Sequence, residues 1–183
     1  MRKFVAAVAA GAALLSTGGT AVATPGTGQQ VTGQRVTQQR AETTTCRSAD
    51  LDVRFGRVSG TAGTTYREVV LTNRGPVACV LRGFPGVSYV DAAGNQVGAA
   101  AVRVGERGPL LTLPHGAAAT SDVGFAAVDN FDPADCRKTP VRGIRVHPPD
   151  ETAPRHLPLV DAYGCAGDVG GFGAHLTVAS VRS

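Results

Sequence analysis

Apolar and polar positions alternate along much of the chain after residue 46, and this pattern predicts short β-strands. Leu51, Val53 and Phe55 alternate with charged residues, which gives the segment one apolar face. The other strand candidates are 66–72, 77–81, 86–90, 100–104, 110–113, 117–128, 141–147, 157–160 and 176–181. Gly, Pro, Asn and Asp cluster between these segments, as turns require. No stretch keeps the 3.6-residue period of a helix, so we expect an all-β domain.

These strands predict an immunoglobulin-like antiparallel β-sandwich, and the alternative architecture is a small β-barrel. Frequent turns between short strands over roughly 135 residues are typical of both folds. The chain contains no Trp. This argues against a domain of the antibody type, because such domains bury a Trp in their core.

The first residues of the chain have the pattern of an export signal. Arg2 and Lys3 supply positive charge, and residues 4–15 form a short apolar core. The segment ends in Ala21-Val22-Ala23, which fits the small-x-small rule for signal peptidase. The apolar core is shorter than the roughly 18 residues of a membrane span, which disfavours a membrane anchor. We therefore expect residues 1–23 to be removed and the protein to be secreted, with no membrane span after cleavage.

Residues 24–45 differ in composition from the segments on either side. Gln, Thr and Gly dominate, and only Val31 and Val36 are sizeable apolar residues. Such a stretch buries too little apolar surface to offset the entropy lost on ordering. We interpret it as a disordered spacer that leads into a single β-sandwich domain of residues 46–183.

The charge balance argues against a nucleic-acid partner. The chain has 18 Lys and Arg residues against 14 Asp and Glu residues, and the export signal holds two of the basic ones. The exported chain therefore carries 16 basic and 14 acidic residues, a net charge near +2. Nucleic-acid binding needs basic residues clustered on one face, and this excess is small and scattered.

The four cysteines all follow the export signal, and an exported chain is expected to pair them. They are Cys46, Cys79, Cys136 and Cys165. Of the three possible connectivities we favour Cys46–Cys79 with Cys136–Cys165, because this arrangement keeps each loop local. Zinc is the competing interpretation, but zinc sites use close pairs such as CxxC, which this chain lacks.

The segment after Cys79 predicts a corner between two strands. Gly83 and Gly86 permit backbone angles that other residues resist, and Pro85 stiffens the chain between them. We interpret these three residues as a structural motif beside a disulfide. The alternative is a loop that grips a ligand.

Several motifs in the same order resemble the family of secreted actinobacterial domains of unknown function numbered 4232. The resemblance covers residues 46 to about 180, and the segment Cys79-Val80-Leu81-Arg82-Gly83-Phe84-Pro85-Gly86-Val87 is its most specific part. The other parts are Cys46, Leu71-Thr72-Asn73-Arg74-Gly75, Leu113-Pro114-His115-Gly116, Cys136 and Val146-His147-Pro148-Pro149. His115 interrupts a Leu-x-Pro-Gly pattern of the family, which we expect to alter only a turn. The resemblance implies a secreted or surface-linked β-rich domain, and it implies no activity, ligand or catalytic residue.

The motifs of common enzymes are missing from the sequence. There is no Gly-x-Ser-x-Gly, no Gly-x4-Gly-Lys phosphate loop, and no cysteine left over for a nucleophile. His147 and His156 flank a Pro-rich loop and are weak candidates for a metal site, with surface histidines as the alternative. Asp129, Asp132 and Asp135 could hold calcium in a loop, with a solvated loop as the alternative.

We therefore expect an exported, non-enzymatic binding or structural module that acts at the cell wall or in the medium. Its partner would be a protein or a cell-wall component of unknown identity, it would need no cofactor, and we expect a monomer. The alternatives are a secreted metal-binding protein and a secreted hydrolase with an unrecognised site. A variant of the first hypothesis is a protease inhibitor that presents residues 103–109 as a rigid loop.

Overall fold

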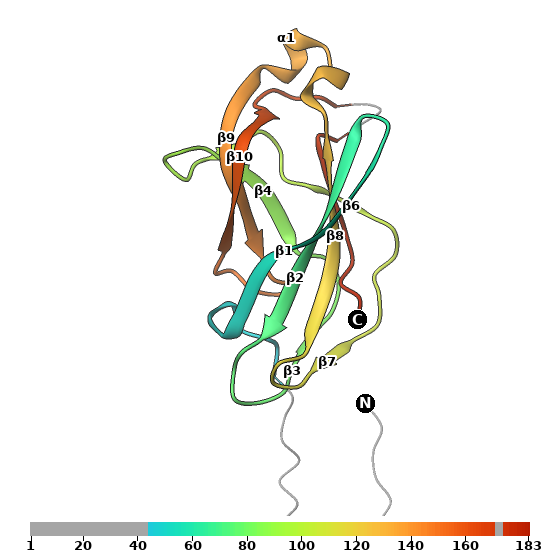
Figure 1. Ribbon diagram of the computed structural model, residues 1–183, viewed down its shortest axis with the longest axis vertical. Coiled ribbons are helices and arrows are strands. Elements are labelled where there is room, and N and C mark those ends of the chain that lie inside the picture. The colour runs from blue at the N-terminus through green and yellow to red at the C-terminus, as the bar shows by residue number, and fades with distance from the viewer. Residues whose placement is uncertain (1–43, 171–173) are drawn as a thin grey trace, which may run out of the picture. The chain divides into compact units, whose positions relative to one another are not determined.

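The computed structural model describes residues 44–170 and 174–183, and Figure 1 shows the path of the chain. The predicted export signal of residues 1–23 lies outside the described residues, as does the predicted spacer up to residue 43. Within the described residues, no helix is long and apolar enough to cross a membrane. The described helices are the short segments η1 (Ser48–Asp50), η2 (Val128–Asn130) and α1 (Pro133–Cys136).

The strands form two main sheets and one short pair. The five-stranded sheet has the order β1-β2-β8-β11-β6, which are Leu51–Thr61, Thr64–Asn73, Ala118–Ala126, Leu176–Ala179 and Val102–Val104. The four-stranded sheet has the order β10-β9-β4-β5, which are Arg155–Cys165, Lys138–His147, Gly86–Val90 and Gln96–Val97. The separate pair consists of β3 (Cys79–Leu81) and β7 (Leu111–Leu113). All strand pairs are antiparallel except β11 with β6, which is parallel.

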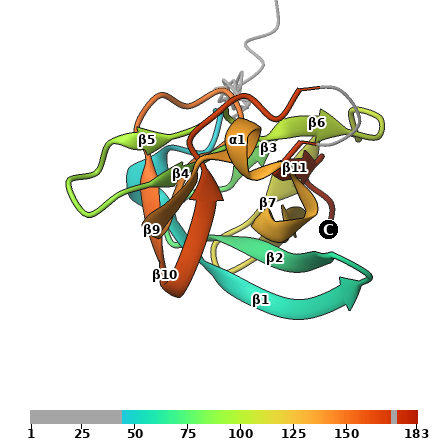
Figure 2. The ribbon, with the colours of Figure 1, turned by 90° about the horizontal axis from the view of Figure 1, so that it is seen from above.

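This arrangement confirms the predicted all-β sandwich. Within the described residues no sheet closes on itself, so the alternative of a barrel is wrong. Figure 2 shows β1 and β2 at one side of the molecule and β4 and β5 at the other. Two strands extend at least five residues beyond the predicted segments: β1 continues to Thr61, and β10 continues to Cys165 past an irregularity between Pro158 and Ala162.

The core lies between the two main sheets and consists of the inward positions of each strand. Val69 and Leu71 of β2 and Val123 of β8 are fully buried. Ile144 and Val146 of β9 are fully buried as well and belong to the same hydrophobic cluster. Burying each of these side chains contributes about 1.5–3 kcal/mol, which is why the period-two pattern fixes which face of each strand turns inward.

Both predicted disulfides are confirmed, because Cys46 is bonded to Cys79 and Cys136 to Cys165. The first of them lies where the chain enters the domain. Thr45 forms a parallel bridge with Val80, and the Val80 N–H donates to the Thr44 carbonyl over 2.9 Å. Thr44 and Thr45, the last two residues of the predicted spacer, therefore pair with β3 along their backbone. Pairing with a strand satisfies their backbone groups.

The predicted corner lies between β3 and β4, as its glycines and proline indicate. Gly83 has a φ of 95°, which favours glycine strongly. Its carbonyl accepts from the Val181 N–H over 2.8 Å, so the corner is tied to the C-terminal end of the domain. Pro85 is buried, and Gly86 begins β4 opposite His147 of β9.

Asn73, the last residue of β2, is fully buried and joins separate parts of the chain. Its Nδ2 donates to the carbonyls of Val77 and Leu113, each over 2.8 Å, and its Oδ1 accepts from the Gly75 N–H over 2.9 Å. One side chain thus hydrogen-bonds three backbone groups. Asn73 belongs to one of the segments that carry the family resemblance.

Candidate functional site

A groove of about 370 Å³ opens between the two main sheets, and both charged and aromatic side chains of the described residues line it. Residues of β2 and β8 from one sheet and of β10 from the other line it. The residues that line it are Thr65, Arg67, Tyr89, Phe125, Ala126, Ala127, Val128, Asp129, Lys138, Leu159, Asp161, Ala162 and Tyr163. Its walls therefore combine aromatic rings with two cations and two carboxylates.

Arg67 lies inside this groove in an unusual position for a charged residue. It follows the same alternation as the buried Val69 and Leu71, so it occupies an inward position of β2. Its guanidinium carbon lies 5.4 Å from the ring centre of Phe55 and 6.0 Å from that of Phe125. Cation–π contacts of this kind hold the side chain in place and leave its N–H donors free. Among the described residues no carboxylate lies within ion-pair distance of Arg67.

Tyr89 contributes its hydroxyl to the same groove. Its ring is packed 6.0 Å from Phe125, and only 3% of the residue is exposed. Burial raises the pKa of Tyr89 to about 12, although the positive charge of Arg67 opposes the shift. The hydroxyl is therefore protonated at neutral pH and offers a donor. Among the described residues no hydrogen bond satisfies it.

The rim of the groove carries the remaining charges. Lys138 Nζ lies 3.0 Å from Asp129 Oδ1 and 5.0 Å from the ring centre of Tyr163. Asp161 has a φ of 48°, within the irregular part of β10 where the pairing with β9 shifts register. No ion pair is formed by Asp161 within the described residues. Among the described residues that line the groove, Lys138 and Asp129 thus form an ion pair, whereas Asp161 and Arg67 have no partner of opposite charge.

This arrangement can bind a group that accepts hydrogen bonds and carries negative charge. A guanidinium and a hydroxyl that both donate would suit a carboxylate, and a guanidinium can hold it through two parallel bonds. The free carboxylate of Asp161 favours a ligand that carries an amine or amide N–H as well. The residues that line the groove include no Ser or Cys that could act as a nucleophile and no His that could act as a general base.

A series of rings continues from the groove into the core. Tyr89 lies 5.3 Å from His175, which is only 3% exposed. Within the described residues, neither ring nitrogen of His175 has a hydrogen-bond partner of good geometry. Burial lowers the pKa of His175, and the nearby Ala99 backbone opposes this only in part. His175 is therefore neutral at physiological pH.

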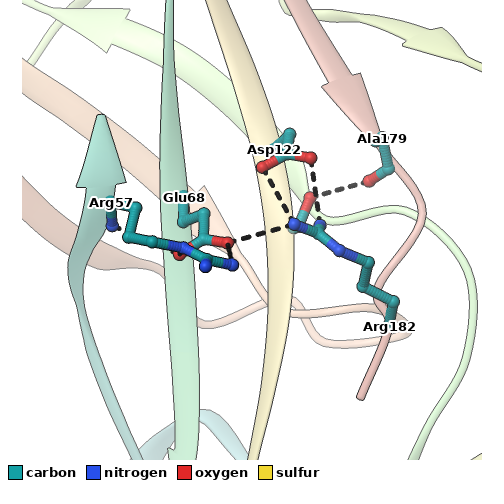
Figure 3. Close-up of polar contacts among 6 residues, drawn as sticks. Arg57, Glu68, Asp122, Ala179 and Arg182 are labelled. Atoms are coloured by element: carbon teal, nitrogen blue, oxygen red, sulfur yellow. Dashed lines mark hydrogen bonds and ion pairs between the residues drawn. The ribbon is translucent and has the colours of Figure 1, made fainter. Parts of the chain in front are cut away.

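A second polar cluster covers the outer face of the five-stranded sheet (Figure 3). Glu68 Oε1 lies 2.9 Å from Arg57 Nη2 and 3.1 Å from Arg182 Nη2. Arg182 also reaches Asp122, with Nη1 to Oδ2 at 3.1 Å. The hydrogen bonds from Arg57 hold the pKa of Glu68 below its usual range. These four charges satisfy one another, so the cluster ties the C-terminal segment to the sheet and offers little to a ligand.

The two histidines predicted as weak metal candidates lie on the outer face of the four-stranded sheet. His156 pairs with Arg145 across β10 and β9, and His147 lies two residues farther along β9. The structure thus places them on one face. Within residues 44–170 and 174–183, no group of three or more His, Cys, Asp or Glu side chains gathers to hold a metal ion. His115 Nδ1 lies 2.9 Å from the Gly75 carbonyl, so it joins its own turn to the turn that follows β2.

Two of the three aspartates considered for calcium have their side chains engaged elsewhere. Asp132 caps α1 by accepting from the Ala134 N–H over 2.8 Å. Asp129 is paired with Lys138 on the groove rim. These contacts favour a structured turn ahead of Cys136 over an ion-binding loop.

Arg67 and Tyr89 were not predicted from the sequence as candidate site residues. A signal for Arg67 was present, because it is in register with the apolar positions Val69 and Leu71 of one strand. A charge on an apolar face is a candidate for a functional position. No local pattern distinguishes Tyr89, since its role depends on the distant strand that carries Arg67.

Comparison with known families gives one match. The model of a family described as "Domain of unknown function (DUF4232)" matches residues 46–182. No curated protein is similar enough to the chain to count as a match.

Proposed function

The chain belongs to the DUF4232 family, whose description assigns no activity, and from this premise we propose a function on structural grounds. The protein is an exported, non-enzymatic binding module that holds a carboxylate-bearing ligand in the groove between its two sheets. The ligand belongs to a protein or cell-wall partner, and the module acts as a monomer.

The observation that carries this proposal is the unpaired guanidinium of Arg67. Arg67 is half-buried and stacks on Phe55 and Phe125, and among the described residues it has no carboxylate partner. A ligand carboxylate would supply the missing partner, and a hydrogen bond between charged groups contributes about 1.5–3 kcal/mol. The neutral Tyr89 hydroxyl supports the same ligand, because a donor beside Arg67 strengthens the hold on an anion.

Export rests on separate support. Two disulfides and the lack of a membrane-spanning helix in the described residues fit an extracellular protein. The predicted signal in residues 1–23 would direct the chain to export. The predicted spacer would hold the domain away from a cell surface. Disulfides persist in oxidising compartments, which fits action at the cell wall or in the medium.

The test is an NMR titration of the exported chain with two matched probes. One is an acetylated dipeptide with a free C-terminal carboxylate, and the other is the same dipeptide as its C-terminal amide. We expect saturable shifts around Arg67 and Tyr89 with the acid only. Arg67→Gln should weaken binding of the acid by about tenfold or more, since one charged hydrogen bond contributes at least about 1.5 kcal/mol. Arg54→Gln, which changes an exposed arginine of β1, is the matched control.

Three outcomes would contradict the proposal. Equal binding of acid and amide would show that the carboxylate is not recognised. Unchanged binding by Arg67→Gln, with a melting temperature like that of the control variant, would place the site elsewhere. Turnover of a peptide, ester or glycan panel by the purified protein would refute a non-enzymatic role and favour the hydrolase alternative.

A further inference from the structure

A second hollow, of about 230 Å³, is bordered by the corner motif that the family resemblance emphasises. The residues that line it are Arg82, Gly83, Phe84, Arg103, Arg107, Pro149 and Asp150. They come from the β3–β4 corner, the edge strand β6 with the loop after it, and the β9–β10 turn. It shares no lining residue with the groove described above.

The charges of this hollow are unbalanced. Three arginines face a single carboxylate among its lining residues. The shortest contact between them joins Arg107 Nη2 to Asp150 Oδ2 at 3.9 Å, and more than half of each side chain is exposed. Arg82 and Arg103 have no carboxylate within ion-pair distance among the described residues. Three guanidiniums that converge without matching acids repel one another, and an anion would relieve this repulsion.

Each of the three arginines lies against a neighbouring residue of the corner or of the loop after β6. A side chain at Gly83 would bring its Cβ to 2.9 Å from Arg107 Nε, so the glycine makes room for that guanidinium. Arg82 Nε donates to the Gly108 carbonyl over 3.2 Å, which leaves its terminal nitrogens free. The Arg103 guanidinium carbon lies 5.8 Å from the ring centre of Phe84. A side chain that a neighbouring contact already orients loses less conformational entropy when a ligand binds.

We propose that this hollow binds a phosphate group. Guanidinium forks match the oxygens of phosphate in pairs, and arginine is the preferred residue where such planar recognition is needed. In this chain the site gives the corner motif a role in gripping a ligand as well as in folding. The proposal is independent of the groove and of the carboxylate ligand assigned to it.

The experiment follows the backbone amide signals of the exported chain during titration with two phosphate probes. Inorganic phosphate represents the free ion, and dimethyl phosphate represents a phosphodiester within a larger molecule. We expect saturable shifts at the amides of Gly83 and Gly108 with at least one probe. Binding by the diester identifies the source as a linked phosphate, and binding by inorganic phosphate alone identifies it as the free ion.

Matched variants distinguish a site from general attraction to positive charge. Arg103→Gln and Arg107→Gln remove one charge each from the hollow and should each weaken binding by about tenfold, because each removes a charged hydrogen bond. Arg142→Gln removes an equally exposed charge from β9 and should leave the affinity unchanged. All three positions are exposed, so the variants should melt like the parent. Shifts that do not saturate, or an equal loss in all three variants, would overturn the proposal.

Discussion

Replacing Asn73 by alanine should destabilise the domain far more than its size suggests. The side chain is fully buried and makes three hydrogen bonds, to the carbonyls of Val77 and Leu113 and from the N–H of Gly75. In Asn73→Ala these backbone groups lose their partner, and the groups of Leu113 and Gly75 do so in a buried place. The same residue ends β2, so the loss affects segments that are 40 residues apart in the chain.

The magnitude follows from the three bonds. Each bond contributes about 0.5–1.5 kcal/mol to the free energy of unfolding, and a buried group that is left without a partner costs more than this net contribution. The sum is about 3 kcal/mol. For a domain of this size that corresponds to a fall in melting temperature of about 10 °C. Asn73→Asp should lose at least as much at neutral pH, because a carboxylate cannot donate to the two carbonyls.

Urea unfolding of the disulfide-bonded protein, followed by circular dichroism, gives the free energy of unfolding. The control is Asn95→Ala, which makes the same chemical change at an exposed turn residue whose amide has one side-chain hydrogen bond. We expect the control to lose less than about 1 kcal/mol. If Asn73→Ala also loses less than about 1 kcal/mol, the inference that this side chain joins three parts of the fold is refuted.

Three further predictions concern His175, two glycines and Glu68. Burial lowers the pKa of His175, so below about pH 6.5 the unfolded chain binds a proton that the folded chain does not, and the free energy of unfolding falls. In His175→Phe the urea midpoint should lose this dependence on pH. Gly98 has a φ of 67°, and an added Cβ would collide with the Cys165 carbonyl, so Gly98→Ala should cost more than about 3 kcal/mol of unfolding free energy. Gly94→Ala also has a positive φ but open space, and should cost about 1 kcal/mol; equal losses would show that the collision is unimportant. Glu68→Gln should lower the melting temperature at neutral pH, because the pKa of Glu68 is lowered and its carboxylate is charged there. Below that pKa the parent is itself protonated, so the two melting temperatures should become equal. A difference in melting temperature that persists in acid would contradict this.

The strand pattern and the cysteine pairing could be predicted from the sequence because both depend on local features. Alternation places Val69 and Leu71 inward whatever their partners are, and short loops favour the observed disulfides. The second half of β1 was missed, because residues 56–61 show no apolar alternation and are paired only along one edge. The parallel pairing of β6 with β11 was missed as well, since it joins segments more than seventy residues apart.

The candidate groove could not be predicted for a related reason. Arg67 and Tyr89 lie on strands of different sheets, and only the packing of those sheets brings them to one hollow. The sequence shows that a charge occupies an apolar register, but not which side chains face it. The histidines at positions 147 and 156 illustrate the converse, since closeness in sequence placed them on one face without assembling a third ligand.

The disulfide at the entrance to the domain has a mechanical consequence. Tension that arrives through residue 44 passes at Cys46 into a covalent link to Cys79, so the strands between these cysteines carry none of it. At about 3.4 Å per extended residue, the 33-residue separation conceals roughly 110 Å of chain from stretching. The second disulfide, with a separation of 29 residues, conceals roughly 100 Å more. A domain loaded through its two ends would therefore extend by less than its full chain length, because the residues between two bonded cysteines are not stretched until their sulfur–sulfur bond is reduced.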